Sequence, residues 1–203
     1  MSWSLGETAA LALKAARGGG LSWGLAEEAA AAVIWLHTNN LPGISALCSY
    51  LGNPDDGPRT DGACPILTGC ALIDGAMPIP AKAGEVTEIG PVRAPLLLLP
   101  FVARLDDGAI WLLASRTTHQ DDHSIDGNAG DSFASHCLSG AAGCQLVRRT
   151  CRQVISPRPE VLRLADHFAC CVERLGTFAH RTYAPATGQS RLSGAGAGLT
   201  DND

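Results

Sequence analysis

The stretch SLGETAALALKAARGGGLSWGLAEEAAAAVIWLH, residues 4–37, predicts two helices joined by a tight turn. It opens with Ser4-Leu5-Gly6-Glu7, which has the spacing of a capping box at a helix N-terminus. Gly18-Gly19-Gly20 then ends the first helix. Ser22 is placed to begin a second helix, which we expect to run to about His37. Both helices are rich in alanine, so we expect them to pack closely.

Beyond these helices the apolar pattern changes, and it predicts a sheet followed by one more helix. We expect the sheet to be antiparallel, because no helical segments separate its strands. The fold class is therefore α+β, with N-terminal helices, a mostly antiparallel central sheet and a C-terminal helix, in a single domain spanning residues 1–203. The expected elements are a third helix from Pro42 to Leu51, strands at Ile66 to Ile73, Val92 to Leu105, Ala109 to Ser115 and Gln145 to Ile155, a hairpin turn at Asp106-Asp107-Gly108, a loop from Gly75 to Gly90, and a last helix from Ser156 to His180.

Composition narrows the class of protein. The chain of 203 residues is 46% hydrophobic and 17% charged, which is typical of a globular protein. Its net charge of -5 argues against a nucleic-acid partner, which needs a basic surface. Glu7 precedes the first basic residue, so the N-terminus does not resemble a signal peptide. The most apolar run, Leu96 to Leu99, is too short to span a bilayer. We therefore expect a cytoplasmic protein without a membrane partner.

The 8 cysteines contain no C-x-x-C pair, so a zinc ribbon or a thioredoxin-like motif is not supported. We expect most of them to be free thiols that serve as small buried apolar groups. Cys137 follows His136 directly, and a cysteine with a histidine can form a nucleophile. Adjacency in sequence does not establish the geometry that such a nucleophile needs, so a structural role is the alternative.

One segment is dense in metal-ligand side chains. His119, Asp121 and His123 lie within five residues, and imidazole and carboxylate groups bind divalent metals such as Zn²⁺. The spacing of the two histidines places both rings on one face only in a helix, whereas the nearby Gly127 and Gly130 indicate a loop. A polar surface loop is therefore the alternative to a metal site.

A second candidate is an anion site at the turn between the first two helices. Arg17 precedes the glycines, and Ser22 stands at the positive end of the second helix dipole, where anions bind. The turn follows a helix rather than a strand and lacks the spacing of a phosphate-binding loop. A plain interhelical turn is the alternative.

The two ends of the chain carry a family resemblance. Residues Ser22-Trp23-Gly24-Leu25-Ala26-Glu27-Glu28 and the ending Arg191 to Asp203 resemble an uncharacterised bacterial family of similar length, which carries only a domain-of-unknown-function label. The resemblance implies a bacterial cytosolic protein and transfers no catalytic residue or substrate. It draws attention to both ends, which we expect to meet. The ending holds Asp201 and Asp203, and we expect it to dock near a pocket, with a tail that makes no such contact as the alternative.

Three functions follow from these observations, and no motif names a reaction or a cofactor. The first is a cytosolic protein that binds a small anionic metabolite, as a binder or as an enzyme, at a site between the N-terminal helices, the sheet and the C-terminal tail. The second is a non-catalytic accessory subunit of a larger bacterial enzyme, and self-association is also open. The third is a metal-dependent hydrolase that uses His119 and His123. The residues expected to line the anion site are Arg17, Ser22, Trp23, Arg191, Asp201 and Asp203.

Overall fold

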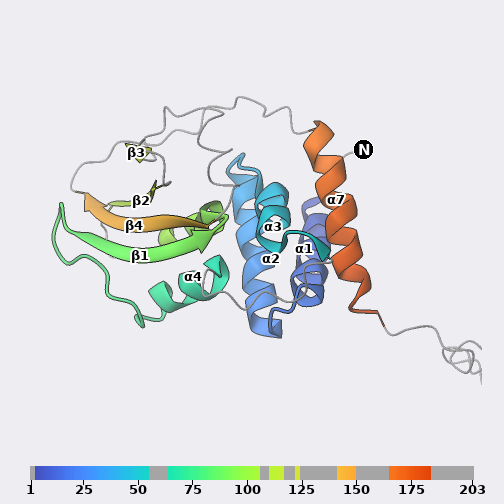
Figure 1. Cartoon of the computed structure of the whole chain (residues 1–203), viewed down its shortest axis with the longest axis horizontal. Coiled ribbons are helices and arrows are strands. Elements are labelled where there is room, and N and C mark those ends of the chain that lie inside the picture. Colours follow the sequence, from blue (N-terminus) through green and yellow to red (C-terminus); the bar gives the residue numbers. More distant parts are fainter. Residues whose placement is uncertain are drawn as a thin grey trace, which may run out of the picture.

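A computed structural model describes residues 3–54, 64–105, 110–116, 122–123, 141–149 and 165–183 (Figure 1). The predicted α+β class is confirmed, because helices gather at one side of the molecule and an antiparallel sheet lies at the other. The elements are α1 (Leu5–Gly18), α2 (Trp23–Thr38), α3 (Gly43–Leu51), α4 (Pro65–Ile73), β1 (Val86–Arg93), the 3-10 helix η2 (Pro95–Leu98), α5 (Leu99–Val102), β2 (Ile110–Arg116), β3 (Asp122–His123), β4 (Ala141–Arg149) and α7 (Ala165–His180).

The first three helices confirm the sequence prediction closely. The Ser4 hydroxyl accepts a hydrogen bond from the Glu7 backbone N–H at 3.2 Å, and the Glu7 carboxylate accepts one from the Ser4 backbone N–H at 2.9 Å. This is the predicted capping box. Gly19 caps the end of α1, and α2 begins directly after Ser22. Local polar and glycine signals therefore set these boundaries.

Helix α7 packs against α1 and α3, so the two ends of the described chain lie side by side (Figure 1). The closest approach is at Gly18, where an added Cβ would lie 1.8 Å from the backbone oxygen of Phe178. Glycine is required here because the two backbones touch. Leu175 and Phe178 enter the same buried core as the alanine-rich faces of α1 and α2. The prediction began α7 at Ser156, and residues 156–164 lie outside the described ranges.

Two predicted strands are wrong, because both segments are largely helical. Ile66 to Ile73 belongs to α4, which starts with Pro65 in its first turn and Cys64 as its N-cap. A short apolar run cannot distinguish a buried strand from a buried helix, and the proline at the start decides for a helix.

The expected strand from Val92 to Leu105 ends at Arg93. Ala94 then adopts a left-handed conformation with φ 43°, and prolines open η2 and α5. The expected hairpin turn at Asp106-Asp107-Gly108 lies outside the described residues, and the element that precedes it is α5 rather than a strand. The expected loop from Gly75 to Gly90 is wrong in its last part, which forms the start of β1.

The sheet has the order β1-β4-β2-β3, and each neighbouring pair is antiparallel, as predicted. The strand expected from Ala109 to Ser115 is confirmed as β2. The one expected from Gln145 begins earlier, at Ala141, and is described to Arg149. One face of the sheet packs on α4, η2 and α5 through two small clusters, formed by Val92, Leu98 and Cys144 and by Leu72, Val102 and Leu146. Among the described helices, none is long and apolar enough to cross a membrane.

Candidate functional site

A group of cationic and aromatic side chains lies where the end of α1, the start of α2 and the residues after α7 meet. We call Lys14, Arg17, Trp23 and Tyr183 the cation–aromatic cluster. Lys14 and Arg17 are three residues apart on α1, so they project from one side of that helix. The contact between Gly18 and Phe178 brings the end of α7 alongside, and this contact positions Tyr183.

The first half of the cluster pairs Arg17 with Trp23. The Arg17 guanidinium lies 4.7 Å from the centroid of the Trp23 ring, in a cation–π arrangement. One of its nitrogens also donates a hydrogen bond to the Leu21 carbonyl. Gly20, with φ 100°, turns the chain back so that α2 can start beside the arginine. The Trp23 side chain remains 64% exposed.

The second half of the cluster pairs Lys14 with Tyr183. The Lys14 ammonium donates a hydrogen bond to the Tyr183 hydroxyl at 3.0 Å and lies 5.1 Å from the ring centroid. The His180 ring meets the Tyr183 ring edge to face, with centroids 5.6 Å apart. Tyr183 is 54% exposed, so both aromatic rings of the cluster present an open surface.

The cluster carries positive charge that no described carboxylate neutralises. Within the ranges given above, neither Lys14 nor Arg17 forms an ion pair, whereas Arg104 pairs with Glu28 at 2.8 Å elsewhere. The Ser22 side chain makes no capping hydrogen bond, so the first-turn N–H groups of α2 are not satisfied by it. Two cations and a helix N-terminus on one surface favour an anion. Glu27 lies one turn beyond Trp23 on α2 and carries a charge of the opposite sign.

The structure thus brings together the predicted residues Arg17, Ser22 and Trp23. Arg191, Asp201 and Asp203 lie outside the described residues, so the predicted role of the tail remains a prediction. The cluster lies on the α1 and α7 side of the molecule, away from the sheet (Figure 1). The expected site between the N-terminal helices, the sheet and the C-terminal tail remains a prediction.

The predicted metal ligands are tested only in part. His119 and Asp121 lie outside the described residues. His123 belongs to the short strand β3, where its backbone pairs with Ser115, and its side chain is not described. In the part of the chain that the structure does describe, no three metal-ligand side chains gather.

Sequence reasoning missed two members of the cluster. Lys14 could have been found, because helical spacing places it beside Arg17. Tyr183 follows the last helix and is far from Lys14 in sequence, so no local pattern indicated the contact. Only the packing of α7 on α1 reveals it.

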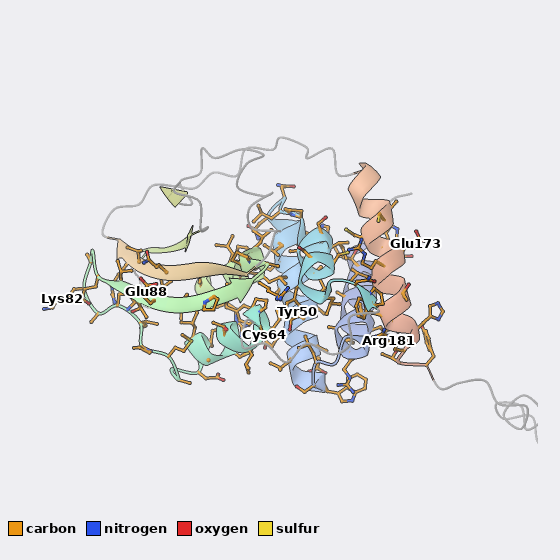
Figure 2. The ribbon with its side chains drawn as sticks, viewed as in Figure 1. Tyr50, Cys64, Lys82, Glu88, Glu173 and Arg181 are labelled. Carbon is orange, nitrogen blue, oxygen red and sulfur yellow. The ribbon has the colours of Figure 1, made fainter. Side chains whose placement is uncertain are left out.

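A second polar arrangement was also missed, at the start of α4. The Tyr50 hydroxyl donates a hydrogen bond to the Cys64 sulfur at 3.1 Å, and the Leu67 backbone N–H donates one at 3.4 Å. Figure 2 shows Tyr50, from α3, beside Cys64. The cysteine occupies the N-cap position that serine or aspartate usually fills. Its two hydrogen bonds account for its position as a cap. Farther along α4, burial raises the pKa of the Cys70 thiol.

Comparison with known proteins supports the resemblance at the N-terminal side. Residues 3–71 match a family model described as "Protein of unknown function (DUF3726)". This stretch includes α1, α2, α3 and most of α4, and with them Lys14, Arg17 and Trp23. The prediction of an uncharacterised family is confirmed over these residues. No curated protein and no solved structure matches the chain.

Proposed function

We propose that the protein is a cytoplasmic binding protein for a small anionic metabolite that also carries a flat apolar group, and that the cation–aromatic cluster is its site. One observation carries the proposal: two cations without a described carboxylate partner lie against two exposed aromatic rings. Charge would select the anion, and the rings would supply apolar contact. Phosphate and carboxylate are the anions that an arginine fork suits best.

Each member of the cluster has a separate role in this proposal. One donor of the Arg17 guanidinium is already bonded to the Leu21 carbonyl, and stacking on the Trp23 ring fixes the orientation of the guanidinium plane. The remaining donors of its fork would bind the anion. Lys14 would act as a mobile point charge. Trp23, covered on one side by Arg17, has exposed surface on which a flat ligand would stack.

The proposal is tested first by native mass spectrometry of the full chain purified from its own cells. We expect a retained small molecule that carries a phosphate or a carboxylate. Titration of that molecule, followed by calorimetry, should then show that Arg17→Gln and Lys14→Gln each weaken binding by about tenfold, which corresponds to about 1.4 kcal/mol. Lys82→Gln is the matched control, because Lys82 is an exposed lysine in the loop before β1, far from the cluster (Figure 2).

Three further variants separate the parts of the site. Arg17→Lys keeps the charge but loses the fork and the ring stacking, so it should bind more weakly than the native chain. Glu27→Gln removes an opposing charge and should tighten binding. Deletion of residues 191–203 tests the tail: unchanged affinity would remove the tail from the site. Full affinity in Arg17→Gln would contradict the proposal itself.

A second candidate, the accessory subunit, is favoured by exposed aromatic and aliphatic side chains on α1 and before it. Trp3 and Leu5 are 39% and 52% exposed, and Trp is favoured as an interface anchor. Trp35, by contrast, packs against the core and is not available for such a contact. This candidate predicts a stable partner subunit and no retained small molecule, and it predicts that Trp3→Ser releases the partner. A second copy of the chain is one such partner.

A further inference from the structure

The cation–aromatic cluster has more hydrogen-bond donors than its own contacts use. One guanidinium nitrogen of Arg17 donates to the Leu21 carbonyl, and the Lys14 ammonium donates to the Tyr183 hydroxyl at 3.0 Å. The remaining donors of both cations have no acceptor among the described residues. The Tyr183 oxygen accepts the bond from Lys14, so its own O–H group can still donate to a ligand. The cluster therefore suits a ligand with several acceptor oxygens.

The start of α2 adds backbone donors beside Arg17. The Ala26 N–H donates to the Ser22 carbonyl at 2.9 Å, and this is the first hydrogen bond within α2. The N–H groups of the first turn precede it, so they have no partner inside the helix. The Ser22 side chain is exposed and does not cap them. Because the Arg17 guanidinium lies 4.7 Å from the centroid of the Trp23 ring, it stands next to these backbone donors.

The charge of the cluster indicates which anion fits best. Lys14 and Arg17 are neighbours on the surface of α1, and neither forms an ion pair with a described carboxylate. Glu27 is exposed to solvent on α2 and pairs with neither cation. A carboxylate brings a single negative charge, whereas a phosphate monoester carries roughly -1.5 to -2 at pH 7 and has three strong acceptor oxygens. The phosphate therefore matches both the two cations and the number of donors.

We infer that the ligand of the cluster is a phosphate monoester of a flat aromatic compound, bound as its dianion; this inference rests on the proposed function. The Arg17 fork and the first-turn N–H groups of α2 bind phosphate oxygens at the positive end of the helix dipole. Lys14 and the Tyr183 hydroxyl add a second charge and a further donor. The aromatic part of the ligand stacks on Trp23, which is 64% exposed. A carboxylate on the same aromatic ring would leave one cation without a counter-charge.

The test is calorimetry of the full chain at about pH 7.5 with three probes that share one flat ring: naphthyl phosphate, naphthyl sulfate and naphthoate. The phosphate and sulfate esters have the same tetrahedral shape, but the sulfate ester carries a single negative charge, so the pair separates charge from shape. We expect the native chain to bind the phosphate ester about tenfold more tightly than either of the other two probes.

Variants show whether the two cations produce this preference. Lys14→Gln removes the second charge and should lower the preference for phosphate over sulfate to about threefold or less. Tyr183→Phe keeps the ring and loses the hydroxyl donor, so it should weaken phosphate binding by a smaller factor. Lys82→Gln is the matched control and should keep the full preference. Each variant should melt at the temperature of the native chain, which shows that it is folded. An unchanged preference in Lys14→Gln would overturn the assignment of the second charge.

The probes also distinguish failure of this inference from failure of the proposed function. Equal binding of all three probes, weakened throughout by Arg17→Gln, would leave the anion site in place and overturn the dianion. Binding of none of them would overturn the aromatic phosphate ester, and the molecule that the chain retains from its own cells then decides the proposed function. Binding of all three with affinities unchanged in Arg17→Gln would overturn both.

Discussion

The helical region, formed by α1, α2, α3 and α7, and the sheet region, formed by α4, η2, α5 and the strands, are built from different kinds of contact. The helical region packs through small residues: alanines at positions 12, 15, 16, 26 and 29 are fully buried, so helix backbones approach closely. The segment between β1 and β2 packs through large buried side chains: Leu96, Leu97 and Phe101 reach the helical core, and Leu98 contacts Val92 and Cys144 of the sheet. Backbone contact should make the first region intolerant of added atoms, whereas side chains in the second can give way in part.

A glycine in each region makes this difference measurable. At Gly18, an added Cβ would meet the backbone of Phe178 at 1.8 Å. At Gly69 on α4, an added Cβ would meet the ring of Phe101 at 2.4 Å. Both contacts are too short for a real Cβ, but the obstacle at Gly18 is a helix backbone and the obstacle at Gly69 is a side chain.

The largest effect is expected for Gly18→Ala. The new methyl group can be accommodated only if α1 and α7 move apart, which opens the alanine-rich core along their contact. We expect a loss of about 3 kcal/mol of unfolding free energy, at the upper end for overpacking, measured by urea unfolding. Gly24→Ala in α2 is the matched control, because an added Cβ there meets nothing within 4 Å. It should be neutral or stabilise by up to about 1 kcal/mol. Equal unfolding free energies for the two variants would show that the backbone contact at Gly18 does not limit the packing of α1 on α7.

Gly69→Ala should lower the free energy of unfolding by a smaller amount, about 1–2 kcal/mol, because the Phe101 ring can shift to admit the methyl group. Adding Phe101→Leu should recover part of this loss, since a smaller side chain leaves room for the new Cβ. The double-mutant cycle therefore reports a favourable coupling between the two positions. Additive losses would show that the ring is not the obstacle.

The same difference explains which parts of the fold could be predicted. The boundaries of α1 and α2 are encoded by residues within one turn of each end, such as Ser4, Glu7 and Gly19, so the sequence predicts them directly. The segments around Ile66 and Leu97 are apolar on all sides, and their state is decided by what they pack against. Proline at positions 65, 95 and 100 was the signal for helix starts that the strand prediction overlooked.

The candidate site follows the same rule. The side containing Arg17 and Trp23 could be predicted, because a tight glycine turn brings neighbours in sequence together. The contact of Lys14 with Tyr183 joins residues 169 positions apart and depends on the docking of α7. Periodicity within a helix says which face is apolar but not which other helix will cover it, so tertiary pairs of this kind escape single-sequence reasoning.

The two serines that precede helices in the helical region differ in whether the side chain caps the helix. Ser4 and Ser22 both precede a helix, but only the Ser4 side chain forms a capping hydrogen bond. We therefore expect Ser4→Ala to cost about 1 kcal/mol of unfolding free energy and Ser22→Ala to be nearly neutral, as measured by thermal unfolding. A loss at Ser22 equal to that at Ser4 would show that residue type alone, and not the hydrogen bond, determines the contribution of a cap.

The smallest effect concerns the pH dependence of the start of α1. Hydrogen bonds from the Ser4 backbone and then from its hydroxyl lower the pKa of the Glu7 carboxyl below its usual 4.5. Since the folded pKa is lowered, the carboxylate stabilises the fold above the unfolded pKa, and this contribution is lost as pH falls through the folded value. The native chain should therefore melt above Glu7→Gln at about pH 7, and the two should converge towards about pH 3. In Ser4→Ala the backbone hydrogen bond remains, so the Glu7-dependent difference should shrink without vanishing. Parallel melting curves for the native chain and Glu7→Gln across this range would mean that the capping box, although formed, does not favour the charged carboxyl.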